Sequence, residues 1–533
     1  MRTVTRMVIG SAVLALAATA CGGGGGGGGG SESGANSFSA NLAEPESLIP
    51  GKTNEDQGGK ILNLLFTPLT GVDQKTGEAT MLVAKSVESK DRQHWTIKLK
   101  DGWKFTNGDP VNAQSFVGAW NATVYNAWDN SYFFTDVLGI QGAQQVAKKK
   151  TKSMSGLKTP DDHTIKINLD APQTNLPLVI NYTAFFPMPQ SILKSKDWKA
   201  YNEKPIGNGK YKMDGKWQHD RSITLAKNED YAGTQPGKAD KITFKIYSDP
   251  DTAYNDVVAG NLDVDVDVPP GRLEEAQQTF GDRYVQAPSS SFTYLGFPLF
   301  LKRFQDVRVR RAFSMAINRE QINQKIYAGT NEVATSIVSP LIKLGHRDDP
   351  CGANCQFNPK KAKQLLDQTD FDKSKVVGFW YNTGAGNKPW VQAAANMIHK
   401  NLGVKVTLKG QEWAQYLDTT DNHKQTGPYR LGWVMDFASP ANYIGPLYTT
   451  NGSSNGSGYS NKVVDEMVQN GNEASSPQAA VKYYHKAEDQ ILDDMPIIPI
   501  YFGTNKAVYT DRISNLTYNA QGYENYDQIV VKG

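Results

Sequence analysis

Apolar and polar residues alternate in several short segments of the first half of the chain. Segments 95–99, 164–169, 223–225 and 242–246 contain many β-branched residues and place apolar side chains at every second position. This period is typical of β-strands. Residues 113–121, between two of these segments, are a helix candidate. Strands and helices that follow one another in this way predict a mixed α/β body.

The second half contains a clearer unit. Residues 376–381 are almost entirely apolar, apolar residues then recur at helical spacing from Val391 to Leu402 until Gly403, and residues 404–408 alternate. A strand, a helix and a strand with short joints predict a βαβ crossover and therefore a parallel sheet.

A pair of helices is predicted upstream of this unit, at residues 309–316 and 321–327. Asn318 and Gln321 have the spacing of a capping box at the start of the second helix. The chain has no repeat of fixed period, which argues against solenoids and propellers.

The N-terminus has the layout of a secretory signal peptide. Arg2 and Arg6 precede the apolar residues 7–18, a stretch too short to span a bilayer comfortably, and small residues lead to Cys21. Residues 16–21 read as a lipobox, in which Cys21 is acylated and becomes the mature N-terminus. The alternative is that Cys21 simply follows an ordinary cleavage site.

The segment after Cys21 predicts a tether rather than a folded element. Residues 22–30 are all glycine, and residues 31–37 are small or polar. About 17 flexible residues have a reach of roughly 20 to 25 Å, enough to hold a folded body just off a membrane surface.

Overall charge and composition exclude some classes of partner. Lysine and arginine number 57 against 54 aspartates and glutamates, without a basic stripe, so we expect no nucleic acid partner. After the signal peptide no segment approaches the ~20 apolar residues of a membrane span, so we expect a soluble body. Its length predicts two to four domains.

Cys351 and Cys355 remain once Cys21 is assigned to the lipid. In an exported protein two cysteines this close favour a small-loop disulfide. A metal pair is the alternative, but no histidine or acidic cluster stands at ligand spacing around them. We expect no metal and no cofactor.

One short motif raises the question of catalysis. Residues 452–456 match G-x-S-x-G, which in a hydrolase would make Ser454 a nucleophile. The match lies within the glycine- and serine-rich loop 451–458, without the apolar strand that such an elbow needs directly before it. The seven histidines are scattered and form no H-E-x-x-H motif. We therefore expect a binding protein rather than an enzyme.

Three aspartates, Asp263, Asp265 and Asp267, alternate with valines. A calcium loop needs a curved backbone and a glycine turn, so this pattern favours one solvated face of a strand.

Several segments, in order along the chain, resemble the family of oligopeptide- and dipeptide-binding proteins that serve ABC importers. The most specific runs from Trp95 through the sequence F-T-N-G-D-P-V-N-A-Q-S-F, and the resemblance extends over about residues 38 to 533. The segments that carry it are 44–50, 95–102, 105–116, 205–211, 227–231 and 307–320.

The resemblance implies a periplasmic-binding-protein-like α/β fold. Two lobes flank a ligand cleft, one carries an extra subdomain, and two crossing segments connect them. The implied parts are the signal peptide 1–20, tether 21–37, lobe I 38–77, 205–288 and 506–533, extra subdomain 78–204, lobe II 296–500, and crossings 289–297 and 497–505.

The implied ligand site centres on Asp436, just before the sequence F-A-S-P. In peptide-binding relatives an aspartate at this place pairs with the α-ammonium of the ligand, which needs a charged hydrogen-bond acceptor once its hydration is lost. Trp433 is expected to flank the cleft and Arg430 to reach toward a carboxylate. Three further ligand-binding candidates are Glu44, Tyr132 and Phe133.

The resemblance implies a function in peptide import. We expect a monomer, lipid-anchored through Cys21 to the outer face of the cytoplasmic membrane, that delivers short peptides to the permease subunits of an ABC importer. The alternatives are the same fold with an oligosaccharide, nickel chelate or haem as cargo, an exported serine hydrolase, and a peptide-sensing receptor. Ligand is expected to shift an equilibrium between open and closed lobes.

Overall fold

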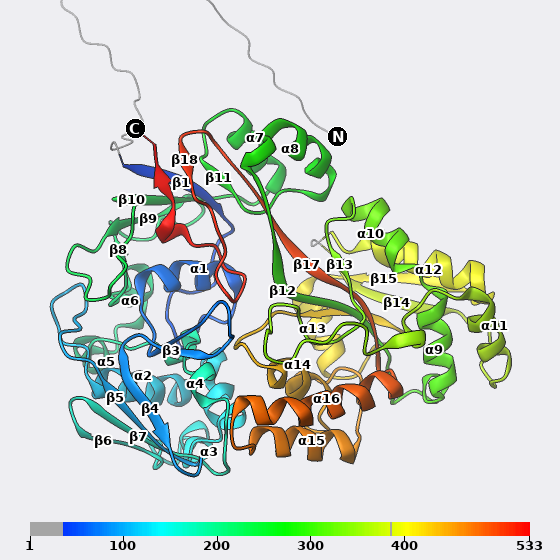
Figure 1. The fold of residues 1–533 in the computed structure, drawn as a ribbon, viewed down its shortest axis with the longest axis horizontal. Coiled ribbons are helices and arrows are strands. Elements are labelled where there is room, and N and C mark those ends of the chain that lie inside the picture. Colours follow the sequence, from blue (N-terminus) through cyan, green and yellow to red (C-terminus); the bar gives the residue numbers. More distant parts are fainter. Residues whose placement is uncertain (1–35, 384–385, 533) are drawn as a thin grey trace, which may run out of the picture.

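A long mixed β-sheet forms the centre of the molecule (Figure 1). The computed structural model describes residues 36–383 and 386–532, so the predicted signal peptide and Cys21 lie outside the described residues. The strands, in spatial order, are β15 (Val406–Gln411), β14 (Val377–Asn382), β16 (Tyr429–Trp433), β12 (Tyr284–Gly296), β17 (Ile497–Tyr509), β11 (Val264–Asp265), β1 (Ser37–Leu42), β10 (Lys241–Ile246), β9 (Ser222–Lys227) and β8 (Tyr211–Met213), with β13 (Glu332–Val333) beside β17.

Strands β12 and β17 connect the two sides of the molecule. Each has 13 residues, and they pair antiparallel from Tyr284 opposite Val508 to Gly296 opposite Ile497. The register shifts between Pro288 and Phe292. Figure 1 shows this ribbon running from the upper centre of the molecule into its right side.

We call the two sides lobe I and lobe II. Lobe I contains β1, β8–β11 and the C-terminal segment, and lobe II contains β13–β16 (Figure 1). The lobe I helices are α1 (Asp56–Leu65), α7 (Pro250–Val258) and α8 (Leu273–Phe280), and β18 (Ile513–Ser514) pairs with β19 (Val530–Val531). Helix α6 (Trp198–Glu203) precedes β8 along the chain. The lobe II helices are α9 (Val307–Ala316), α10 (Arg319–Tyr327), α11 (Pro359–Asp367), α12 (Lys388–Leu402), α13 (Trp413–Asp421), α14 (Pro440–Tyr448), α15 (Lys462–Asn472) and α16 (Pro477–Asp494).

A separate four-stranded sheet lies below lobe I in Figure 1. Its strands, in spatial order, are β4 (Ala84–Ser89), β5 (His94–Leu99), β7 (Thr164–Asn168) and β6 (Leu157–Asp161). The nearby elements are β2 (Thr70–Val72), β3 (Ala79–Met81), α2 (Ala113–Tyr125), α3 (Ala143–Ala147), α4 (Leu176–Val179) and α5 (Gln190–Ser195). The predicted strands at 95–99, 164–169, 223–225 and 242–246 and the helix at 113–121 are all confirmed, to within a residue or a few at their ends.

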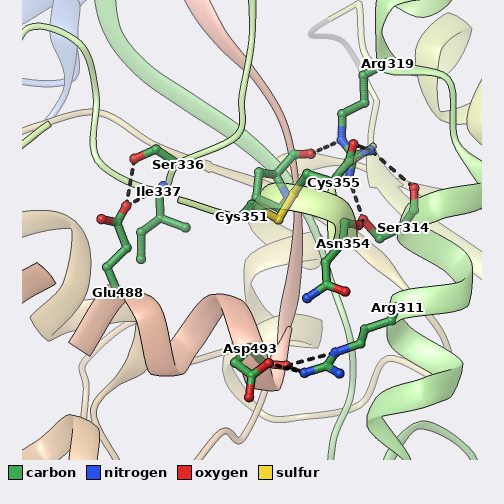
Figure 2. Close-up of a disulfide and its surroundings, with 11 residues drawn as sticks. Arg311, Ser314, Arg319, Ser336, Ile337, Cys351, Asn354, Cys355, Glu488 and Asp493 are labelled. Carbon is green, nitrogen blue, oxygen red and sulfur yellow. Dashed lines mark hydrogen bonds and ion pairs between the residues drawn. A yellow bond between two sulfur atoms is a disulfide. The ribbon is translucent and has the colours of Figure 1, made fainter. Parts of the chain in front are cut away.

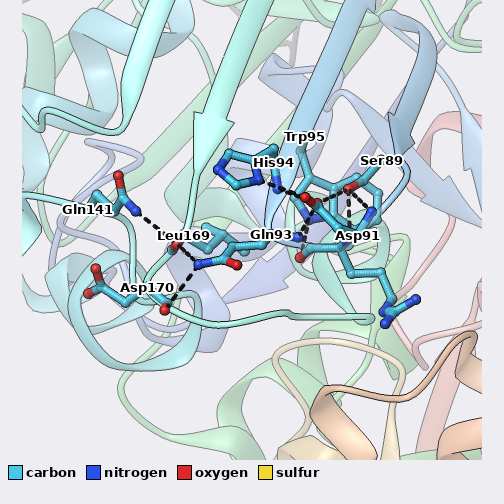
Figure 3. A network of polar contacts seen from close by, with 9 residues as sticks. Ser89, Asp91, Gln93, His94, Trp95, Gln141, Leu169 and Asp170 are labelled. Atoms are coloured by element: carbon cyan, nitrogen blue, oxygen red, sulfur yellow. Dashed lines mark hydrogen bonds and ion pairs between the residues drawn. The ribbon is translucent and has the colours of Figure 1, made fainter.

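The turn between β4 and β5 is held by the carboxylate of Asp91 (Figure 3). Its Oδ1 accepts hydrogen bonds from the backbone N–H groups of His94 at 2.8 Å and Gln93 at 3.0 Å. These bonds favour the charged form, so the pKa of Asp91 is well below its usual range. Local hydrogen bonds therefore fix the turn of this short hairpin.

The predicted βαβ unit is confirmed. β14 and β15 are parallel over six residue pairs, and α12 connects them. The helix ends at Gly403, whose φ of 74° is in the left-handed region that favours glycine. The buried side of α12, which includes Trp390 and Ile398, packs in the core of lobe II.

The predicted helix pair is α9 and α10, but only half of the capping box forms. The Asn318 side chain accepts a hydrogen bond from the Gln321 N–H at 2.8 Å. The Asn318 N–H donates to Met397 Sδ at 3.3 Å instead of to the Gln321 side chain. Tertiary packing against α12 thus replaces the return bond.

The prediction that Asp263, Asp265 and Asp267 form a solvated strand face is wrong. β11 lies inside the sheet between β17 and β1, so Asp263 and Asp265 are buried, with 3% and 0% exposure. Asp263 accepts hydrogen bonds from Ser39 and Arg512. Asp265 Oδ2 has no partner among the described residues, and burial raises the pKa of Asp265 to about 7. Only Asp267 is exposed.

A disulfide joins Cys351 and Cys355 (Figure 2). The Cys355 carbonyl accepts a hydrogen bond from Arg319 Nη1 at 2.8 Å, and the Asn354 carbonyl accepts one from Ser314 Oγ at 2.6 Å. The disulfide loop is therefore tied to α9 and α10.

None of the helices formed by the described residues is long and apolar enough to cross a bilayer.

Candidate functional site

A cavity of about 770 Å³ lies between the lobes. Segments from distant parts of the sequence line it: residues 54–63 at α1, 129–132, 181–183, 266–267, 289–290 of β12, 432–436 at the end of β16, 453–454, Asn505 of β17 and 521–524. A cavity of this size can enclose a ligand of drug-like dimensions or a short peptide.

Asp436 is placed on the cavity wall by the end of β16. The strand ends at Trp433, and the next residues turn toward α14, which contains Asn442. Asn442 Oδ1 accepts from the Asp436 N–H at 2.8 Å and from Trp433 Nε1 at 3.1 Å, while Asn442 Nδ2 donates to Asp436 Oδ2 at 3.0 Å. One buried amide side chain thus orients both predicted site residues.

Asp436 keeps one oxygen free. Tyr132 Oη donates to the same Oδ2 at 3.1 Å, and no described residue donates to Oδ1. Burial raises the pKa of Asp436 to about 6, although both hydrogen bonds oppose that rise. A desolvated carboxylate with an unused oxygen is suited to a cationic ligand group.

Tyr132 joins the two sides of the cavity. Its ring contacts Phe133 at a centroid distance of 4.3 Å, and its hydroxyl reaches across to Asp436. Burial and the Asp436 charge raise the pKa of Tyr132 well above its ordinary value, so the phenol stays a proton donor.

The other sequence candidates do not line the cavity. Phe133 is fully buried against Tyr182 and Phe185. Glu44 bonds His219 Nδ1 at 2.8 Å, away from the cavity wall. Arg430, also on β16, donates to Asn382 at 3.1 Å.

Ser454 does line the cavity, but in a setting unlike a hydrolase elbow. Its loop follows α14 rather than a strand, and the Ser454 N–H donates to the Pro446 carbonyl at 3.0 Å. Among the described residues no histidine bonds Ser454; the nearby His423 Nε2 contacts the Asn455 carbonyl at 3.2 Å.

Sequence reasoning missed a polar cluster on the lobe I wall. Lys60 Nζ lies 3.1 Å from Asp56 and 3.6 Å from Glu524. Burial lowers the pKa of Lys60, but the two carboxylates outweigh burial and hold it well above its ordinary value. Burial raises the pKa of Glu524 to about 7. No local motif marks these residues, because they meet only in the folded chain.

No group of three or more histidine, cysteine, aspartate or glutamate side chains in the described part of the chain is arranged to hold a metal ion.

Known proteins are similar to this chain over nearly its whole length. The chain is 29% identical to the oligopeptide-binding protein OppA of Bacillus subtilis over 508 residues, covering 92% of this chain and 91% of OppA. It is 29% identical to the periplasmic murein peptide-binding protein MppA of Escherichia coli over 476 residues, covering 87% of this chain and 86% of MppA.

A solved structure of the Escherichia coli murein tripeptide-binding protein MppA matches with a TM-score of 0.78 at 25% identity, covering 93% of this chain and 98% of MppA. The model of the bacterial extracellular solute-binding proteins, family 5, matches residues 78–455. The chain therefore belongs to the bacterial extracellular solute-binding proteins of family 5.

Proposed function

We propose that this protein captures short peptides in the cavity between its lobes and delivers them to an ABC importer. The observation that carries the proposal is the free Oδ1 of Asp436 on the wall of a 770 Å³ cavity. A peptide's α-ammonium needs such an acceptor when it leaves water. The names of the relatives, which bind oligopeptides and murein peptides, support the same cargo.

The peptide backbone has a suitable edge to pair with. Beyond Tyr429, which lies opposite Trp380, no described strand pairs with the outer edge of β16. Gly432, Trp433 and Val434 line the cavity there. An extended peptide added to a strand edge gains main-chain hydrogen bonds that do not depend on its sequence.

In the same proposal, lobe I comprises 38–77, 205–288 and 506–533, the extra subdomain 78–204 and lobe II 296–500, with crossings at 289–297 and 497–505. The long strands β12 and β17, which run between the lobes, support the crossings. The protein acts as a monomer held at the membrane by a lipid on Cys21. Asp436, Trp433 and Tyr132 contact the peptide.

Calorimetry with paired peptides tests the ammonium site. Wild-type protein, freed of co-purified ligand, is titrated with tetra-alanine and with its N-acetylated form. We expect Asp436→Asn to weaken binding of the free peptide roughly 100-fold, as for other truncated buried charge pairs. The acetylated peptide should bind weakly to both proteins. Asp282→Asn, an exposed aspartate outside the cavity, is the matched control.

Native mass spectrometry of the protein as purified from cells tests the cargo class. Co-purified masses in the peptide range, lost in Asp436→Asn, support peptides. Retention of an oligosaccharide, nickel chelate or haem, with no affinity for any peptide, would overturn the peptide proposal and leave the fold unchanged.

A further inference from the structure

The cavity between the lobes is much more acidic than the protein as a whole. The whole chain has 57 lysines and arginines against 54 acidic residues. The described residues that line the cavity include one lysine, Lys60, and no arginine or histidine. The acidic lining residues are Glu55, Asp56, Asp129, Asp267, Asp436 and Glu524.

The single lysine of the described lining is already ion-paired with acidic side chains of the protein. Lys60 is 7% exposed and pairs with Asp56 at 3.1 Å and with Glu524 Oε1 at 3.6 Å. Glu55 is likewise occupied, because it caps the N-terminus of α1 by accepting from the Gly58 and Gln57 N–H groups. The remaining cavity charge is therefore negative.

Besides Asp436, two acidic side chains, Asp129 and Asp267, are left to meet a ligand, and Glu524 keeps one oxygen that Lys60 does not contact. Asp129 is exposed and has no hydrogen bond or ion pair to its carboxylate among the described residues. Among the described residues, the Asp267 carboxylate accepts a single hydrogen bond, from Asn41 Nδ2 at 3.4 Å. Glu524 has a side chain 6% exposed, and its Oε2 is buried without a partner in the described structure. An unpartnered buried carboxylate oxygen is a costly arrangement unless a ligand completes it.

We propose that this cavity selects peptides that carry a lysine or arginine side chain in addition to the α-ammonium. The inference rests on the proposed function, since Asp436 takes the ammonium and the other acids take the side chain. Asp129 and Asp267 supply long-range attraction in a cavity walled by protein, where charge acts more strongly than in bulk water. An acidic side chain finds no free cation among the described lining residues to compensate for the loss of its hydration.

A matched peptide series tests the selection without any mutation. Tetra-alanine analogues with one lysine at position 2, 3 or 4 are compared with the same peptides carrying Nε-acetyl-lysine, which keeps the length and removes the charge. At the best position we expect the lysine peptide to bind about tenfold more tightly, and a glutamate peptide about tenfold less tightly, than the acetylated one. The preference should become smaller as the salt concentration is raised from 20 to 500 mM, because salt screens the attraction between the cavity carboxylates and the lysine side chain.

Variants then locate the effect. Asp129→Asn and Asp267→Asn should each reduce the ratio of lysine to acetyl-lysine affinity by about threefold. Asp282→Asn, exposed and outside the cavity, should leave the ratio unchanged. Thermal unfolding checks that each variant is folded. The comparison of peptides on the wild-type protein does not depend on the variants.

The outcomes separate the two proposals. Equal affinity for lysine, acetyl-lysine and glutamate peptides at every position, with binding still dependent on Asp436, would overturn the charge selection and keep peptide capture. Absence of binding for every peptide would overturn the proposed function itself.

Discussion

At the scale of single residues, we expect Asp436 to couple peptide binding to pH. Burial raises its pKa to about 6 in the unliganded protein. A ligand ammonium stabilises the carboxylate, so protonation of Asp436 competes with binding. The affinity for a peptide with a free N-terminus should therefore be full above about pH 7 and fall about tenfold by pH 5, as measured by calorimetry.

The N-acetylated peptide is the control for this titration. Glu524, whose pKa is about 7, lines the same cavity and titrates in the same range. Titration of Glu524 changes the affinity for both peptides. The difference in affinity between the free and the N-acetylated peptide therefore reports on Asp436. A free peptide whose affinity is the same at pH 5 and pH 7 would contradict the ammonium site.

Asp265 is a second residue whose setting predicts a measurable effect, this time on stability. Its folded pKa of about 7 is raised above the ordinary value of 3.8. A group with a raised pKa contributes stability that is present below the unfolded value and lost as pH rises through the folded one. Asp265→Asn should therefore raise the free energy of unfolding at pH 8, by about 2 kcal/mol after the unpaired amide is allowed for.

The gain from Asp265→Asn should be smaller at pH 5, where the folded wild-type protein already holds Asp265 protonated. Denaturant unfolding at the two pH values measures this difference. The same substitution at Asp282, an exposed site, should change stability little at either pH.

At the scale of elements, the disulfide loop holds the connection between β13 and α11 against α9 and α10. Cys351 and Cys355 are four positions apart, so the bond closes only a small ring. Loss of the disulfide in a Cys351→Ser, Cys355→Ser variant should lower the free energy of unfolding by about 2 kcal/mol in the chain-entropy account. Peptide affinity should be unchanged, because neither cysteine lines the cavity.

Reduction of the wild-type protein with dithiothreitol provides the comparison for this variant. Its unfolding midpoint should shift to that of the double variant, whereas the double variant itself should not respond. A reduced wild-type protein with an unshifted midpoint would show that the loop gains nothing from the bond.

At the scale of the whole molecule, a small set of polar contacts joins lobe II to the opposite side of the molecule. Tyr132 bonds Asp436 at 3.1 Å, and Asn175 bonds Tyr484 at 2.8 Å. Ser439 Oγ also donates to Asn175 Oδ1 at 3.1 Å, and the Thr174 N–H donates to the Asn472 carbonyl at 2.7 Å. The strands β12 and β17 connect the lobes as well, and their register shifts between Pro288 and Phe292. A ligand that bonds both sides should shift the population toward closed molecules.

Small-angle X-ray scattering measures this closure. We expect a saturating free peptide to reduce the radius of gyration, and its N-acetylated form to have a smaller effect at the same concentration. Asp436→Asn should need a higher peptide concentration for the same change. Scattering profiles that stay identical with and without saturating peptide would rule out closure.

Local pattern was sufficient for most of the secondary-structure elements, and the family resemblance indicated the region of the proposed ligand site. Alternation predicted β5, β7, β9 and β10, and the βαβ pattern around Gly403 predicted parallel β14 and β15 because both depend on side-chain periods of two and 3.6. The resemblance placed Asp436, Trp433 and Tyr132, and all three line the cavity. Glu44, Phe133 and Arg430 came from the same resemblance but do not line the cavity, since alignment does not say which side chains face a cleft.

Sequence alone thus determined most of the secondary structure, which depends on neighbours along the chain, and resemblance to known sequences indicated the family and the position of the proposed ligand site. Tertiary structure alone decided that Asp265 is buried inside a sheet, and that Lys60, Asp267 and Glu524 meet in one cavity. These residues come from positions hundreds of residues apart. Their burial and charge depend on which strands lie beside one another, and no local period carries that information.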